Sequence, residues 1–160
     1  MKRKLYNFTH TSFFKSKIYA PNTINDLIKH TESKHTIVGN RRSYGDSFIG
    51  KKKIISLKNF NKILNINYKD QTVKVEGGTL LCNLFKFTLN KNLVLTCAPG
   101  CKYVSVGGMI ANNISGKLTR KNSIKNYVKS IKILTNKKKI INCSKYKNKK
   151  LFDLTIGGKG

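Results

Sequence analysis

The chain has 160 residues, and its 33 lysines and arginines outnumber its 6 acidic residues so far that the formal net charge is +27. Hydrophobic residues make up 39% of the composition, with 8 Phe and 7 Tyr, which indicates a folded domain and excludes a disordered basic tail. This length suits one domain, or two small lobes that share an interface.

The first part of the chain predicts one helix and several strands. A helix is expected over residues 23–31, where Thr23 can act as N-cap, Asp26 follows three residues later, and apolar residues recur at helical spacing. Short strands are expected at 35–39 and 52–57, and the alternating segments 63–68 and 71–78 predict a hairpin around Lys69 and Asp70.

The remainder of the chain repeats this mixture of elements. Leucines at helical spacing predict an amphipathic helix over 79–92, and the apolar run 93–100 predicts a strand that ends in a Pro-Gly turn. Two glycines open the apolar segment 104–117, in which a helix is expected to start near Met109. Segments 128–135 and 138–143 predict a second hairpin, and 151–160 runs an apolar segment into a glycine turn.

The positive charge is spread along the chain as lysine. Lysine occurs with an excess of asparagine and isoleucine, and A/T-rich codons would supply all three, so we ascribe much of the charge to that composition. The sequence shows no zinc-finger spacing, RNP-like aromatic motif or helix-turn-helix pattern. We therefore do not expect nucleic acid to be the main ligand, although the charge would attract any polyanion, including an anionic membrane surface.

The cysteines and the hydropathy pattern indicate a cytoplasmic protein without a metal site. Cys82, Cys97, Cys101 and Cys143 form no C-x-x-C pair and lack a nearby histidine, so we expect thiols in a reducing compartment. The basic start is not followed by the apolar run of a signal peptide, and no segment approaches the roughly 20 apolar residues of a membrane span.

Two glycine loops have a composition suited to holding phosphate. The first is GNRRSYGDSF, residues 39–48, and the second is VSVGGMIANNISGK, residues 104–117. Small residues permit close approach of backbone N–H groups to an anion, and a helix that starts at the second loop would aim its N-terminus at it. Each loop alone could equally be an ordinary turn or a close-packing site, and neither is a Walker loop or a G-x-G-x-x-G motif.

In their order and spacing, five segments together resemble the FAD-linked oxidases of the vanillyl-alcohol oxidase type, also called PCMH-type flavoproteins. They are GNRRSYGDS, VEGGTLLCNLFKFTLNKNLVLTCAPG, VSVGGMIANNISGK, NYVKSIKILT and LFDLTIGGKG. Decaprenylphosphoryl-ribose 2'-oxidases are the most similar group, and sugar-lactone oxidases are more distant. The resemblance implies an α+β fold, a PCMH-type FAD-binding domain over residues 1–160 with approximate lobes at 1–98 and 99–160.

The same resemblance implies that the two loops bind FAD, noncovalently since the first loop lacks a histidine. The first loop would wrap the pyrophosphate with Gly39, Asn40, Arg41, Arg42, Ser43, Tyr44, Gly45, Asp46 and Ser47. The other side of the dinucleotide would be lined by Gly100, Ser105, Val106, Gly107, Gly108, Ala111, Asn112, Ser115, Gly116 and Lys117.

Four positions depart from the family pattern. Arg41 and Lys125 stand where glycine is usual, Ser115 where histidine is usual, and Leu118 where asparagine is usual. If Arg41 cannot take the backbone angles of a glycine, the loop must shift and bind FAD less tightly. Ser115 removes an imidazole near the flavin.

The resemblance implies the FAD-binding part of an oxidoreductase that acts on an alcohol group of a sugar or sugar lactone. Relatives continue past the last glycine turn into a substrate domain, so we expect an incomplete domain, with a second polypeptide as one source of the missing part. No catalytic residue is identifiable in this chain. The alternatives are a truncated relic without activity and a basic module that binds nucleic acid or another polyanion, whose affinity would fall steeply with salt.

Overall fold

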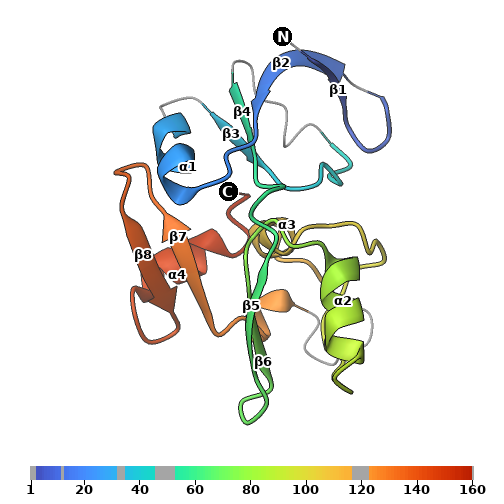
Figure 1. Ribbon diagram of the computed structural model, residues 1–160, viewed down its shortest axis with the longest axis vertical. Helices are drawn as coiled ribbons and strands as arrows, with labels where there is room; N and C mark the ends of the chain where they lie inside the picture. The colour runs from blue at the N-terminus through green and yellow to red at the C-terminus, as the bar shows by residue number, and fades with distance from the viewer. Residues whose placement is uncertain (1–2, 12, 32–34, 46–52, 117–122, 160) are drawn as a thin grey trace.

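The computed structural model describes residues 3–11, 13–31, 35–45, 53–116 and 123–159. At one end of the molecule lies a mixed four-stranded sheet in the order β1-β2-β4-β3 (Figure 1). Its strands are β1 (Arg3–Tyr6), β2 (Phe13–Tyr19), β3 (Thr36–Val38) and β4 (Lys53–Ser56). The pair β1–β2 is antiparallel, whereas β4 runs parallel to both β2 and β3. Strand β3 ends at Val38, so this sheet places the first glycine loop.

Helix α1 (Ile24–His30) connects β2 to β3 and confirms the helix expected there. The hydroxyl of Thr23 accepts a hydrogen bond of 3.1 Å from the backbone N–H of Asp26, which satisfies one free donor of the first turn. The helix contains no fully buried residue, and Ile24 is 49% exposed. It contacts the sheet at Tyr19, whose ring centroid lies 4.6 Å from that of His30.

The middle of the chain forms the second layer of the molecule. Strands β5 (Ile63–Asn67) and β6 (Thr72–Val75) make the expected antiparallel hairpin, with one irregularity between Ile63 and Asn65. Helix α2 (Leu81–Leu89) follows, and α3 (Val106–Ala111) lies at the centre, between the sheet and this hairpin (Figure 1). The structure thus confirms that the chain mixes helices and strands.

The last third adds a short helical turn, a hairpin and a final helix. They are the 3-10 helix η1 (Ile124–Asn126), β7 (Ser130–Leu134), β8 (Ile140–Ser144) and α4 (Lys149–Thr155). The β7–β8 pairing confirms the second predicted hairpin. The chain then returns to the centre, where the N–H of Gly157 donates to the carbonyl of Ile110 at 3.0 Å and that of Lys159 to Ala111 at 2.8 Å.

Three clusters of buried apolar side chains hold these layers together. Leu5, Val38 and Ile54 form one inside the four-stranded sheet, with Phe14 and Ile18 against it. A second cluster joins α2 and α3 through Leu81, Cys97, Met109 and Ile124, and a third joins β8 and α4 through Cys143, Phe152 and Ile156. Ile110 and Val128 contact both of the last two clusters, so α3 is the element on which the C-terminal half packs.

Three parts of the fold differ from the sequence-based expectation. Residues 93–97 alternate between exposed and less exposed side chains, but the segment 93–100 pairs with no strand among the described residues. Strands β1 and β2 were not predicted, and neither was the helical state of 149–155. No helix among the described residues is long and apolar enough to span a membrane.

Candidate functional site

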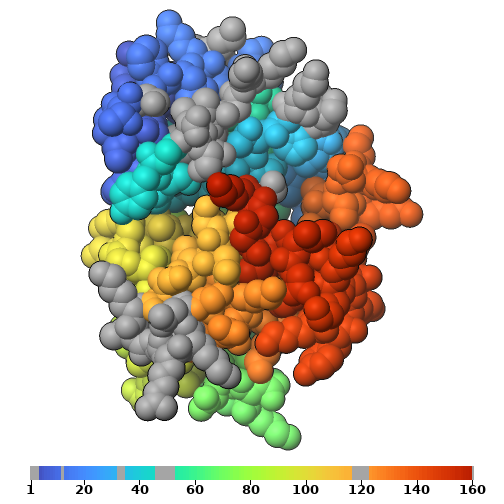
Figure 2. Space-filling model, turned by 180° about the vertical axis from the view of Figure 1, so that it is seen from behind, coloured from blue at the N-terminus to red at the C-terminus, as the bar shows by residue number. Residues whose placement is uncertain are grey.

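The first glycine loop leaves the sheet at Gly39 and packs directly against the start of α3. A Cβ added to Gly39 would overlap the hydroxyl of Ser105 and lie 2.9 Å from its Cβ. Ser105 is buried, and its hydroxyl accepts a hydrogen bond of 3.3 Å from the N–H of Gly108. Only glycine fits at position 39 while Ser105 caps α3. The two loops that the sequence separates by about sixty residues are therefore in contact, and Figure 2 shows the cyan and yellow segments side by side.

Polar and aromatic contacts fix the next residues of the loop. The side-chain amide of Asn40 donates to the carbonyl of Tyr103 at 2.8 Å. The guanidinium of Arg42 lies between two rings, 5.5 Å from the centroid of Phe8 and 5.8 Å from that of Tyr103. Such contacts orient a cation without neutralising it. In the described part of the chain, neither Arg41 nor Arg42 has a carboxylate within ion-pair distance.

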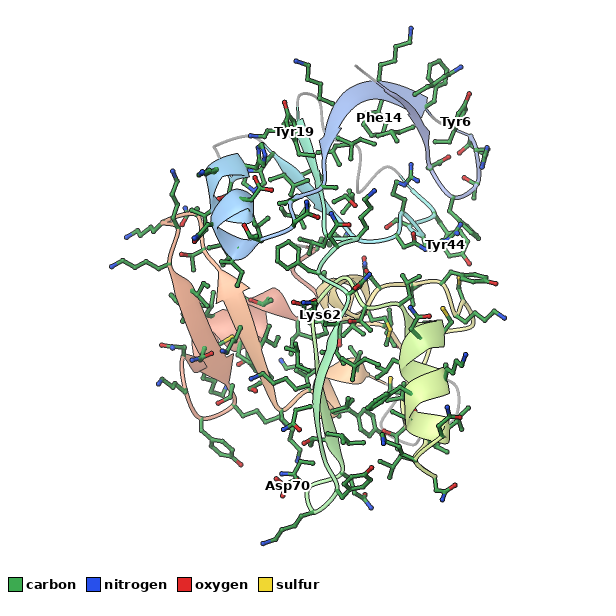
Figure 3. The ribbon with its side chains drawn as sticks, viewed as in Figure 1. Tyr6, Phe14, Tyr19, Tyr44, Lys62 and Asp70 are labelled. Carbon is green, nitrogen blue, oxygen red and sulfur yellow. The ribbon has the colours of Figure 1, made fainter. Side chains whose placement is uncertain are left out.

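The connection between β1 and β2 supports the end of the loop. The N–H of Phe8 donates to the carbonyl of Ser43 at 3.3 Å, and the side-chain amide of Asn7 donates to that of Tyr44 at 3.2 Å. The rings of Phe8 and Tyr44 meet edge to face, with centroids 5.4 Å apart. The loop is thus held by its carbonyls and side chains, and Tyr44 is visible at the right-hand edge of the molecule in Figure 3.

The backbone N–H groups of the loop are not used in these contacts. For residues 40–44, no N–H donates a hydrogen bond to any group in the described chain. Arg41 has a φ of 53°, which lies in the left-handed region that glycine adopts without cost. Alternation of hand along a backbone turns successive N–H groups toward one side, as in anion-binding nests. The condition under which the loop would have to shift is therefore not met, because Arg41 takes a left-handed φ of 53°.

The N-terminus of α3 does not point free donors at a ligand. The N–H of Val106 donates to the carbonyl of Thr79 at 2.9 Å, and that of Gly107 to Gly77 at 2.7 Å. With Gly108 bonded to Ser105, the first three amides of the helix are satisfied within the protein. A Cβ on Gly107 would lie 2.9 Å from the carbonyl oxygen of Gly77. The sequence-based idea that α3 offers unpaired N–H groups was wrong, and this glycine pair serves close packing.

The remaining predicted residues are spread along α3 and its C-terminal end. Gly116 is buried, and its added Cβ would lie 3.0 Å from the backbone nitrogen of Ala98. Asn112 bonds its amide to the carbonyl of Gly108 at 2.9 Å, Ser115 is exposed and bridges to Ser123, and Gly100 has open space around it. Asp46, Ser47, Leu118 and Lys117 lie outside the described residues.

Sequence reasoning missed the residues that support the first loop. Phe8, Asn7 and Tyr103 carry no motif, and only their contacts reveal them. Gly77 was seen as the end of a hairpin, whereas it accepts the amide of Gly107. Lys125, which replaces a usual glycine, pairs at 3.0 Å with Asp153 of α4.

The ionisable groups near the loops give no sign of acid-base or metal chemistry. Burial raises the pKa of the Cys97 thiol, which keeps it protonated and unreactive. Among the described residues, no group of three or more His, Cys, Asp or Glu could hold a metal ion. Within the described chain, the site has a row of N–H groups without a hydrogen-bond acceptor and two guanidinium groups without a carboxylate partner, and such donors suit a phosphate.

Comparison with known protein families agrees with this geometry. The family model described as "FAD binding domain" matches residues 22–144, which include the first loop, α3 and the β7–β8 hairpin. The chain belongs to this family. This chain is thus an FAD-binding domain of the PCMH-type flavin-dependent oxidoreductases, and its cofactor is FAD. The N–H groups of residues 40–44, which have no partner in the described chain, and the guanidinium groups of Arg41 and Arg42 are donors of the kind that a pyrophosphate accepts.

Three curated relatives share this FAD-binding domain. The decaprenylphosphoryl-beta-D-ribose oxidase of Mycolicibacterium smegmatis is 33% identical over 74% of this chain and 26% of its own length. The D-lactate dehydrogenase of Anaerostipes hadrus is 29% identical over 70% of this chain and 25% of its own. For cytokinin dehydrogenase 1 of Arabidopsis thaliana the identity is 31% over 58% of this chain and 16% of its own. The chain therefore matches about a quarter or less of each relative.

Proposed function

We propose that residues 39–45 hold the pyrophosphate of FAD, with Asp46 and Ser47 completing the loop. The observation that carries this proposal is the run of unpartnered N–H groups over residues 40–44, next to the guanidinium groups of Arg41 and Arg42. Oriented amides and a charged donor bind a diphosphate more strongly than neutral hydrogen bonds alone. Arg42 is oriented by its two aromatic neighbours, so little conformational freedom is lost when it meets the anion.

The second loop has a different role in this proposal. Ser105, Gly107 and Gly108 hold α3 close to Gly39 and Gly77, which fixes where the first loop stands. The flavin side of the site, between lobes at 1–98 and 99–160, would be formed by a second set of residues. These are Gly100, Val106, Ala111, Asn112, Ser115, Gly116 and Lys117. The first loop contains neither histidine nor cysteine among residues 39–47, so we propose noncovalent binding.

For the reaction, we propose oxidation of an alcohol group on a sugar or sugar lactone. Two of the similar proteins carry a ribose and D-lactate in their names, and both compounds have an alcohol carbon that a flavin can oxidise. FAD accepts the hydride when it is bound, and the protein supplies position and electrostatics. The substrate-binding region would lie outside the 160 residues, on the same or on a second polypeptide.

The four cysteines form no disulfide, which agrees with a cytoplasmic location.

Titration with FAD, FMN and riboflavin, followed by quenching of flavin fluorescence, tests the proposed pyrophosphate site. FAD should bind more tightly than FMN, and riboflavin should bind least, because only FAD presents a diphosphate. Arg42→Gln should weaken FAD about 10- to 100-fold, as expected for loss of a charge-assisted contact. Lys74→Gln removes the same charge from β6 and should change little. Equal affinity for FAD and riboflavin would contradict the proposal, and no binding by the folded chain would favour a relic.

A further inference from the structure

The exposed surface of the β1–β2 hairpin forms a second site. Side chains alternate along the two strands, so Leu5, Phe14 and Ile18 face the buried cluster. The opposite surface, which we call the outer hairpin face, carries Lys4, Tyr6, Phe13, Lys15 and Lys17, all exposed. Figure 3 shows Tyr6 on the outside of the hairpin and Phe14 beneath it. This face is therefore aromatic and basic, without an aliphatic side chain.

The rings on this face are arranged in a stack. Tyr6 and Phe13 are cross-strand partners with centroids 5.9 Å apart, and His10 stacks on Tyr6 at 5.1 Å with an interplanar angle of 14°. The ammonium group of Lys4 lies 3.9 Å from the centroid of Phe13. Phe13 is 57% exposed and Tyr6 is 38% exposed, which is costly for apolar surface with no partner. The rings are thus ordered before any ligand arrives.

Charge is one-sided around this stack. The first acidic residue of the sequence is Asp26, so the whole β1–β2 region has basic residues and no carboxylate of its own. At the other end of the same sheet, α1 covers the surface through His30 and Tyr19. No element among the described residues covers the outer hairpin face in this way (Figure 1). A planar, anionic ligand complements both its rings and its lysines.

We propose that the outer hairpin face binds single-stranded nucleic acid. Bases would stack on Tyr6, His10 and Phe13, while Lys4, Lys15 and Lys17 meet the phosphates, as on other sheet surfaces that bind single strands. An anionic membrane is the rival partner for a basic surface, but surfaces that insert into membranes carry a broad apolar face of Trp, Phe and Leu side chains. Of the five side chains named for the outer hairpin face, Phe13 alone is of this kind. The proposed site uses the outward-facing side chains of the hairpin, whereas the first glycine loop contacts the hairpin through Asn7 and Phe8.

Fluorescence anisotropy with a labelled 12-nucleotide oligo(U) probe tests the proposal on the full chain. The double variant Tyr6→Ala/Phe13→Ala should bind the probe at least about 25-fold more weakly, because the loss of each stacking ring weakens binding about 5- to 150-fold. Tyr146→Ala is the matched control, since Tyr146 is 98% exposed beside lysines on another surface. It should leave affinity unchanged. Circular dichroism melting of each variant shows whether it is folded.

The salt dependence separates the site from the general charge. Replacing Lys4, Lys15 and Lys17 by Gln should reduce the slope of log affinity against log salt by about 2, at roughly 0.7 per phosphate contact. The same replacement of Lys137, Lys138 and Lys139 in the β7–β8 turn removes equal charge and should change the slope less. Equal effects of the two triple variants would overturn the proposal. Binding to phosphatidylserine vesicles without binding to oligo(U) would also overturn it and identify a membrane surface.

Discussion

Replacing Gly39 by alanine should lower the free energy of unfolding, because the contact between the first loop and the N-terminus of α3 has no room for a methyl group. The new methyl group would occupy the position of the Ser105 hydroxyl, which caps α3. Loss of an N-cap costs about 1 kcal/mol, and overpacking of a closed contact adds about 1–3 kcal/mol. Because Ser105 is 3% exposed, its side chain cannot move into solvent to avoid the overlap. We expect Gly39→Ala to lose about 2–4 kcal/mol of unfolding free energy.

For a chain of this size, that loss corresponds to a fall in Tm of about 4–16 °C. Thermal and urea unfolding followed by circular dichroism measure it, and FAD titration should show weaker binding, since the loop is pushed away from α3. Adding Ser105→Gly removes the obstructing hydroxyl and Cβ, and a glycine N-cap costs only a few tenths of a kcal/mol. The double variant should therefore recover most of the lost stability.

Gly100→Ala provides a control, because a Cβ at Gly100 meets no atom within 4 Å. It should leave the Tm unchanged. Refutation is simple: if Gly39→Ala melts with the parent chain, or if the double variant melts no higher than Gly39→Ala, then Gly39 and Ser105 are not in contact and the two loops do not form one site.

Three further perturbations address other parts of the molecule. Arg41→Gly should keep the loop and leave the unfolding free energy within about 1 kcal/mol, whereas Arg41→Val should weaken FAD binding, because a β-branched residue resists a φ of 53°. Hydrogen bonds from Lys149, then from Lys125, hold the pKa of the Asp153 carboxyl below its ordinary value of 3.8. A lowered pKa stabilises the fold above that ordinary value and ceases to do so as pH falls through the folded-state pKa, so the Tm difference between the parent and Asp153→Asn should shrink below about pH 4. Phe152→Ala, at a fully buried position, should cost about 3–5 kcal/mol in urea unfolding, and a loss below 1 kcal/mol would contradict the third cluster.

Elements that depend on local signals were predictable from the sequence. Helix α1 follows from Thr23 and Asp26, and both hairpins follow from alternation around a polar turn. Strand β2 was missed because its alternation is interrupted: Phe14 and Ile18 face the buried cluster, but Ser16 between them is polar and buried, and the apolar Phe13 is exposed. Segment 93–100 was predicted as a strand from its apolar run, but strand pairing depends on a neighbouring strand that the segment itself does not encode.

The candidate site shows the same division. The composition of the first loop indicated an anion, and the structure adds that the amides of residues 40–44 have no acceptor in the described chain. The prediction for the second loop was wrong because the backbone N–H groups of Val106 and Gly107 donate to the carbonyls of Thr79 and Gly77. No local pattern in residues 104–117 indicates these partners. The contact between Gly39 and Ser105 forms only when the chain is folded, so it could not be predicted from the positions of the two residues in the sequence.

The return of the chain to α3 has a consequence for exchange kinetics. The amides of Gly157 and Lys159 are bonded to carbonyls at the end of the central helix, although both residues are exposed. Their protons exchange only when these hydrogen bonds break, so hydrogen exchange at these two positions reports the separation of the C-terminal segment from the central helix. Amides next to a chain terminus usually exchange rapidly, whereas these two should exchange slowly as long as the C-terminal segment stays bound to α3.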